Sequence, residues 1–237
     1  MKLYKWLAKD GSSYNGGVGK WPLPAGNRPG AWMPKLELPL IECKHGYHLC
    51  RPCDLPYWIS PTLWVAEARG HIKDWDDKVG VQQARLLRRI ETWNGRVARL
   101  FACDCAERAL HCFETHYPGN DRLQRAVEIM RRSLENGMTH EEFTAANANA
   151  SQGLRIAWLD WHAGGPKATP VAWDAAHAVL SAIWAVGNWG RFPSAVDAVR
   201  NAVIDAGRAT GWAKEECEWQ AMRLCKLLGI ELDEGEG

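Results

Sequence analysis

The 237 residues are 46% hydrophobic and 24% charged, which is ordinary for a soluble globular protein and long enough for one large domain or two small ones. The net charge of +1 hides an asymmetry, because residues 1–90 carry 14 Lys and Arg against 8 Asp and Glu, and residues 91–237 carry 15 against 20. This small basic surplus does not favour binding to duplex nucleic acid. No segment has the roughly 18 uninterrupted apolar residues of a membrane span, and the first residues lack the apolar core of a secretion signal. We therefore expect a cytoplasmic protein with reduced cysteines.

Residues 1–90 are rich in turn signals such as "DGSSYNGG" and "PLPAGNRPG", which separate short apolar runs. The runs "LYKWLA", "LWVAEAR" and "KVGVQQARLLRRI" have the composition and partial alternation of strands. The pattern predicts a small α+β module over residues 1–90 with a mostly antiparallel sheet.

After residue 91 the apolar period becomes helical. The segment "VARLFACDCAERALHCFETHY" has an apolar face and is followed by a turn at Pro118-Gly119. "THEE" at 139–142 is a capping box that opens the third helix, and Gly229 closes the last one. We expect six helices in a bundle over residues 91–237, so the predicted fold class is α+β with a sheet module before a helical bundle.

From residue 101 onward the helical half contains "ACDCAERALHCFETHYPGNDRLQRAVEIMRRSLENG", then "AANANASQGLRIAWLDWH" and "AWDAAHAVLSAIWAV". These segments resemble the immunity protein family of bacterial toxin systems. That family has a helix with an Ala-Glu-Arg core, a second helix of the form D-x-R-x-x-x-A, and later alanine-rich helices with histidines. Leu123 departs from a Pro that is common in the family. The resemblance implies that the chain binds and neutralises a protein, and it supplies no catalytic residues to transfer to this sequence. The matching residues are Ala106, Glu107, Arg108, Asp121, Arg122, Ala126, Ala175, Ala176 and His177.

Charged residues of this half suggest two local arrangements. Asp104 and Arg108, like Glu107 and His111, are spaced for ion pairs within one helix. The carboxylates and imidazoles of two later helices could gather if those helices pack antiparallel, although their spacing has no known metal signature. Those four residues are Asp160, His162, Asp174 and His177.

The segment "KHGYHLCRPCDLPYWISPTLWVAEARG" resembles an uncharacterised bacterial and phage domain with a G-[FY]-H-x-C core, seen here from Gly46 to Cys50. That domain begins with a Tyr-Lys strand, here Tyr4-Lys5, and ends with a "DDKV" strand, here at 76–79. The resemblance assigns no activity. Because such domains occur in phages, one form of the protein-binding hypothesis is a phage-encoded inhibitor of host defence.

The same region is weakly similar to small ADP-ribosyltransferase folds, in which a short helix ending in an aromatic residue (here 55–58) precedes a strand that carries a glutamate. The resemblance implies an alternative enzyme that binds NAD or another nucleotide with Glu67, Tyr57 and His48. Tyr57 or Trp58 would stack on the nicotinamide, and Glu67 would polarise a ribose hydroxyl. Lys5 stands where that pattern has His or Arg.

The stretch "IECKHGYHLCRPCDLPYW" also offers candidate zinc ligands, namely Cys43, Cys50, Cys53 and His48, but only the last two cysteines have the usual clip spacing. A reactive thiol at Cys50 or Cys53 is a further alternative. The sequence favours a turn and a strand that frame a cleft, with the cysteines as small core residues. No cofactor is expected, and NAD and zinc remain alternatives.

The preferred hypothesis is a non-enzymatic inhibitor that binds a toxin or defence effector. Aromatic and arginine side chains are the usual anchors of such interfaces. The candidates are Trp158 and Trp161, and also Trp189 and Arg191 in the glycine-bracketed loop "VGNWGRFP". Packing of these tryptophans between helices is the competing interpretation.

Overall fold

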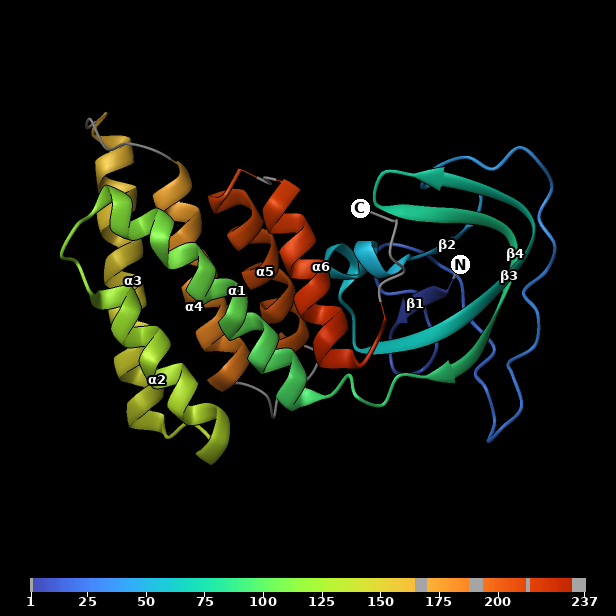
Figure 1. The fold of residues 1–237 in the computed structure, drawn as a ribbon, viewed down its shortest axis with the longest axis horizontal. Helices are drawn as coiled ribbons and strands as arrows, with labels where there is room; N and C mark the ends of the chain where they lie inside the picture. Colours follow the sequence, from blue (N-terminus) through green and yellow to red (C-terminus); the bar gives the residue numbers. More distant parts are fainter. Residues whose placement is uncertain (1, 165–169, 188–193, 212–213, 232–237) are drawn as a thin grey trace. The chain divides into compact units, whose positions relative to one another are not determined.

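The structure is a computed structural model that describes residues 2–164, 170–187, 194–211 and 214–231. The chain divides into two compact units. The sheet unit consists of the residues up to Trp93 together with those from Ala221 on, and the helical unit runs from Asn94 to Gln220. The mixed α+β class is confirmed, with a four-stranded antiparallel sheet followed by helices (Figure 1).

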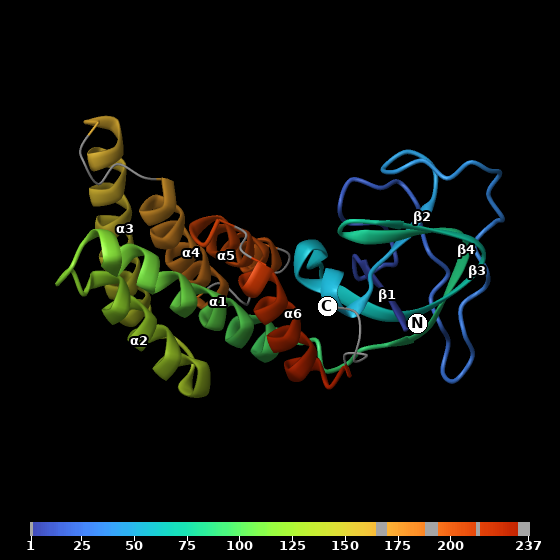
Figure 2. The same cartoon turned by 45° about the horizontal axis from the view of Figure 1, so that its top comes forward.

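The sheet unit contains four strands in the order β1-β3-β4-β2, all antiparallel. The long strands β3 and β4 form a strongly curved hairpin in both views (Figures 1 and 2). Register shifts at Val65/Ala66 and at Arg69/Ile72 account for this curvature, since bulges bend strands and increase their twist. The strand bounds are β1 Leu3–Leu7, β2 Tyr47–Leu49, β3 Thr62–Trp75 and β4 Lys78–Arg89.

The curl brings the two edge strands together. Tyr4 on β1 and Cys50, just after β2, exchange backbone hydrogen bonds of 2.9 and 2.8 Å. An extended segment around residues 30–36 also lies alongside β4, because the amides of Gly30, Met33 and Leu36 donate to β4 carbonyls. The sheet therefore closes almost into a barrel, and its inner core contains Leu3, Leu7, Trp21, Met33, Leu49, Trp64, Ala66, Val79, Val81, Ala84 and Leu86.

The 3-10 helix η1 (Pro52–Trp58) follows β2. The described residues hold seven helices, not six: the six α-helices expected after residue 91, and η1 before them. Only the ADP-ribosyltransferase resemblance implied a helix near η1, because two prolines and a length of seven residues give no helical period. Pro52 at its first position and the bonds between Arg51 and Asp54 start η1.

The helical unit is built around α4, whose small residues are almost all buried and which packs against α1, α3 and α5. Asn94 caps α1 by accepting from the amides of Arg96 and Val97. The predicted capping box of α3 is confirmed, because Thr139 and Glu142 bond each other's backbone amides. The bounds are α1 Gly95–His116, α2 Arg122–Asn136, α3 His140–His162, α4 Pro170–Gly187, α5 Ser194–Ala209 and α6 Lys214–Leu228.

Helix α6 begins in the helical unit, and its residues from Ala221 on belong to the sheet unit. In the sheet unit Thr92 donates to the carbonyl of Leu228, and the Cys225 thiol lies 3.7 Å from the carbonyl of Pro52. The predicted domain ranges, 1–90 and 91–237, place this last segment with the helices instead. No α-helix in the described ranges is both long and apolar enough to cross a membrane.

Candidate functional site

The sheet unit contains a cleft of about 670 Å³ where the edges of β1 and β2 meet. Its walls come from β1, the loop Ser13–Gly19, the turn Cys43–Gly46, β2, η1 and the start of β4. The cleft therefore depends on closure of the sheet, which joins residues that lie more than 70 positions apart. Among the residues that define it are Lys5, Trp21, Lys44, Tyr47, His48, Trp58 and Lys78.

Three lysines line the cleft, and no Asp or Glu is among its described lining residues. Lys78 is compensated, because its ammonium lies 2.7 Å from Asp77 and 2.8 Å from Glu42. Burial works to lower the pKa of Lys78, but its hydrogen bonds to these carboxylates outweigh burial and raise that pKa. The positive charge of Lys78 is thus neutralised by carboxylates of the protein itself.

Lys5 is different. Its ammonium is half-buried, donates to the backbone carbonyl of His48 at 2.8 Å and lies 5.1 Å from the ring centre of Trp21. In the part of the chain that the structure describes, no carboxylate pairs with Lys5. Desolvation lowers the pKa of Lys5 to about 8, because the protein surroundings disfavour the charged amine.

The imidazole of His48 packs edge-on against Trp75, with 5.4 Å between ring centres. Its Nε2 atom is buried and has no hydrogen-bond partner within the described residues. Burial, and then the charges of Lys5 and Lys78, lower the pKa of His48 to about 4, so the ring is neutral at pH 7. His48 thus lines the cleft as a neutral side chain, and Lys5 is the cleft lysine whose charge the protein disfavours.

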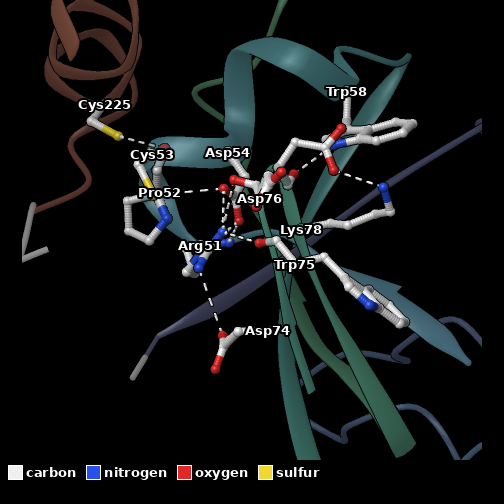
Figure 3. Close-up of polar contacts among 11 residues, drawn as sticks. Arg51, Pro52, Cys53, Asp54, Trp58, Asp74, Trp75, Asp76, Lys78 and Cys225 are labelled. Carbon is white, nitrogen blue, oxygen red and sulfur yellow. Dashed lines mark hydrogen bonds and ion pairs between the residues drawn. The ribbon is translucent and has the colours of Figure 1, made fainter. Parts of the chain in front are cut away.

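A network centred on Arg51 connects η1 to the β3–β4 hairpin (Figure 3). Arg51 makes two hydrogen bonds to the buried carboxylate of Asp54 and one to the carbonyl of Trp75. The Trp58 indole donates to the carbonyl of Asp77 at 2.8 Å, and its ring lies 5.0 Å from the Lys78 ammonium. Because η1 is tied to the β3–β4 hairpin in this way, Trp58 forms a rigid wall of the cleft.

The predicted turn and strand at 41–50 are confirmed, with Ile41 and His45 bridging the turn. The prediction that the cysteines are small core residues holds for Cys50, which is buried, and is wrong for Cys43, which is exposed at φ 56°. Cys53 is half-buried beside Asp54. Burial raises the pKa of the Cys50 thiol well above its usual range, which disfavours a thiolate nucleophile.

The four candidate zinc ligands are not gathered. Among the described residues, no group of three or more His, Cys, Asp or Glu side chains could hold a metal ion. Cys43 lies in an exposed turn, Cys50 is buried, and Cys53 belongs to η1, so the chain turns between the candidate ligands. The same finding holds for Asp160, His162, Asp174 and His177, which could have gathered if their two helices packed antiparallel.

The residues of the alternative enzyme site are not brought together around the cleft. His48 lines it, whereas Glu67 and Tyr57 are not among its lining residues. Glu67 lies on β3, where its carboxylate pairs with Arg85 at 2.6 Å. Sequence reasoning treated Lys5 only as a departure from a family pattern and treated the glycine-rich loop only as a turn. The signal for Lys5 was a lysine inside the apolar strand "LYKWL".

In the helical unit the residues of the Ala-Glu-Arg core connect helices. Arg108 on α1 pairs with the buried Glu216 on α6 at 2.7 Å and stacks on Trp219. Arg131 on α2 bonds both Asp104 and Glu107 on α1. Asp104, Glu107 and Arg108, which were expected to pair within α1, thus form ion pairs with residues of α2 and α6.

Helices α4 and α5 also carry a charged cluster. The imidazole Nδ1 of His177 lies 2.7 Å from a buried carboxylate oxygen of Asp205, and the ring stacks on Trp173. The hydrogen bond to Asp205 raises the pKa of His177 against the effect of burial. Asp160, which was expected here, instead accepts from the Tyr117 hydroxyl at 3.1 Å.

The last turns of α3 carry an exposed aromatic group. Trp158 is 46% exposed and Trp161 is 43% exposed. Their rings lie 4.0 and 5.2 Å from the ring of His162. Trp189 and Arg191, the other two interface candidates, lie outside the described residues.

Comparison with known protein families gives a match in the helical region. A family model described as "Imm-5 like putative immunity protein" matches residues 88–153, less than a third of the chain. The matched stretch runs from the end of β4 through α1 and α2 into α3. No curated protein and no solved structure matches the chain. The helical region is thus similar to an immunity protein family.

Proposed function

We propose that this chain is a non-enzymatic inhibitor that binds a protein toxin, or a related defence effector, through its helical unit. The observation that carries the proposal is the match of residues 88–153 to the immunity protein model. Immunity proteins act by stoichiometric binding, so the relevant features are exposed anchors on a rigid support rather than a catalytic constellation.

The end of α3 supplies such anchors. Trp158, Trp161 and Leu159 are each more than two-fifths exposed, although large apolar side chains are costly to leave in water. The ring of His162 packs against both indoles and restricts their rotamers before binding. The tryptophans would therefore lose less side-chain entropy when they bind a partner. Pre-ordered aromatic side chains with a polar neighbour are typical of binding hot spots.

The helix beneath this aromatic group is well supported. Ala146, Ala150, Gly153 and Ala157 form one buried stripe along α3. Arg122 on α2 donates to Gln152 on the same helix at 3.0 Å. The tryptophans lie just beyond the matched stretch, so we assign the shared scaffold to residues 88–153 and this chain's own specificity to the end of α3.

The experiment uses the proteins encoded beside this chain in its own genome as candidate toxins. Each is produced in bacteria with and without the chain, and growth is measured together with complex formation between the purified proteins. The wild-type chain should restore growth against one of them and form a complex of one chain per toxin. If no neighbouring protein is bound or neutralised, the proposal fails.

The double variant Trp158→Ala/Trp161→Ala locates the interface. We expect it to lose about 100-fold or more in affinity, since each hot-spot tryptophan typically contributes at least about 2 kcal/mol. The matched control is Trp184→Ala on α4, where the indole is 46% exposed but packs on Phe143 at the other end of α3. Equal affinity of the double variant and wild type would place the interface elsewhere.

A further inference from the structure

The cleft of the sheet unit has a charge pattern that the inhibitor function does not use. Lys5 and Lys44 line it without a carboxylate partner among the described residues, and the remaining lining lysine, Lys78, is already paired. Lys44 is exposed, but Lys5 is partly buried, and a partly buried ammonium that lacks a counter-charge costs folding free energy. An anion in the cleft would offset that cost.

A glycine-rich loop beside Lys5 can complete an anion site. The loop "SYNGGVG" lies on the rim, with Gly16 at φ 78° and Gly17 and Gly19 also lining the cleft. Glycines let a ligand approach backbone amides closely, as phosphate-binding loops do.

The other walls are aromatic. Trp21 lies 5.6 Å from Tyr47 between ring centres, and the Tyr47 hydroxyl donates to the carbonyl of Pro34. Trp58 is held by its bond to Asp77, on the same side as Lys78. A volume of about 670 Å³ lies within the range of small-molecule sites. Aromatic walls and several cations together suit a ligand with a planar ring and more than one negative charge.

We propose that this cleft binds a mononucleotide-sized ligand, with a phosphate group contacting Lys5 and Lys44 and a base lying against the aromatic walls. Phosphate is favoured over a single carboxylate because two lysines lack a counter-ion and the glycines of the rim leave room for a ligand to approach the backbone. The site belongs to the sheet unit, whereas toxin binding is assigned to the helical unit. The two proposals are therefore independent, and each can fail alone.

The test is isothermal titration calorimetry of the full chain at low ionic strength, where charge contributions are least screened. AMP and UMP serve as phosphate-bearing probes, with adenosine, inorganic phosphate and benzoate as comparisons. We expect at least one nucleotide to saturate at one per chain and to bind more tightly than all three comparison compounds. Adenosine or benzoate binding as tightly as the nucleotides would overturn the phosphate assignment, and the absence of nucleotide binding would overturn the site.

Three variants locate the binding. Lys5→Met should weaken nucleotide binding about 10- to 100-fold, the effect of losing one buried charge-assisted hydrogen bond. Lys44→Met, on the exposed turn, should weaken it about threefold. The matched control is Lys35→Met, an exposed lysine that does not line the cleft, with an expected change of less than about twofold. Circular dichroism checks that each variant is folded. Unchanged affinity in both cleft variants would place any nucleotide elsewhere.

Discussion

The ammonium of Lys5 on β1 donates a hydrogen bond of 2.8 Å to the backbone carbonyl of His48 on β2. The two residues are 43 positions apart and meet because Tyr4 and Cys50 close the edges of the curled sheet. The hydrogen bond holds the ammonium of Lys5 at the cleft, where desolvation disfavours its charge. The same position would allow Lys5 to bind an anion.

Lys5→Met should keep the fold and increase the free energy of unfolding at pH 7 by about 1 to 3 kcal/mol. Desolvation lowers the pKa of Lys5 from 10.5 to about 8, while the neighbouring Cys50 thiol opposes this shift. The folded state therefore disfavours the charged amine at pH 7. Because the unfolded chain binds more protons between these two values, wild-type stability should rise with pH from about 8 to 10.5. Urea denaturation at several pH values measures both effects, and a variant less stable than wild type at pH 7 would contradict this prediction.

Gly80→Ala should destabilise the protein by about 1 to 3 kcal/mol, the usual cost of overpacking. A Cβ atom at position 80 would lie 2.2 Å from two ring carbons of Trp75. The Trp75 ring also packs on His48, so a displaced ring would disturb the cleft. The substitution should cost much less in a Trp75→Ala background, where the clashing ring is gone. An equal cost in both backgrounds would show that Trp75 is not the cause.

Glu67→Gln should change the free energy of unfolding by less than about 1 kcal/mol, as expected for a partly exposed ion pair. The carboxylate pairs with Arg85 at side-chain exposures of 42% and 29%, and Glu67 does not line the cleft. Nucleotide affinity should therefore remain within about twofold of wild type by calorimetry. Loss of binding in this variant would restore the ADP-ribosyltransferase-like alternative, in which Glu67 belongs to the site.

The pair of His177 and Asp205 should make stability depend on pH. The hydrogen bond to Asp205 raises the pKa of His177 above 6.5, with Asp174 adding to the shift and burial and Arg208 opposing it. The stabilisation of the folded state by protonated His177 is complete below pH 6.5 and is lost as the pH rises through the raised pKa.

The pH dependence can be assigned by substitution. Asp205→Asn should remove this loss of stability, which we expect to be about 1 kcal/mol between pH 6 and 9. His162→Gln, at an exposed histidine on α3, is the control and should retain it. An identical pH profile in Asp205→Asn and wild type would contradict the assignment. Chemical denaturation across this pH range provides the measurement.

Local patterns identified most elements. "LYKWL" and "KVGVQQARLLRR" form β1 and β4, and the change from strand-like to helical periodicity lies close to the boundary at Asn94. Thr139 and Glu142 start α3 through contacts three residues apart, so the sequence contains all the information for that cap. No local pattern predicted η1, because its prolines and its short length give no helical period, and only the ADP-ribosyltransferase resemblance implied a short helix there.

The sequence alone thus determined the α+β class, the antiparallel character of the sheet, the main helices and the resemblance of residues 101 onward to immunity proteins. These features depend on side-chain periodicity and on interactions between residues a few positions apart. Tertiary structure alone decided that Arg108 pairs with Glu216, that the four candidate zinc ligands stay apart, and that Lys5, His48 and Lys78 share one cleft. Each of these depends on the curl of the sheet or the packing of helices, which brings distant residues together and which no local pattern encodes.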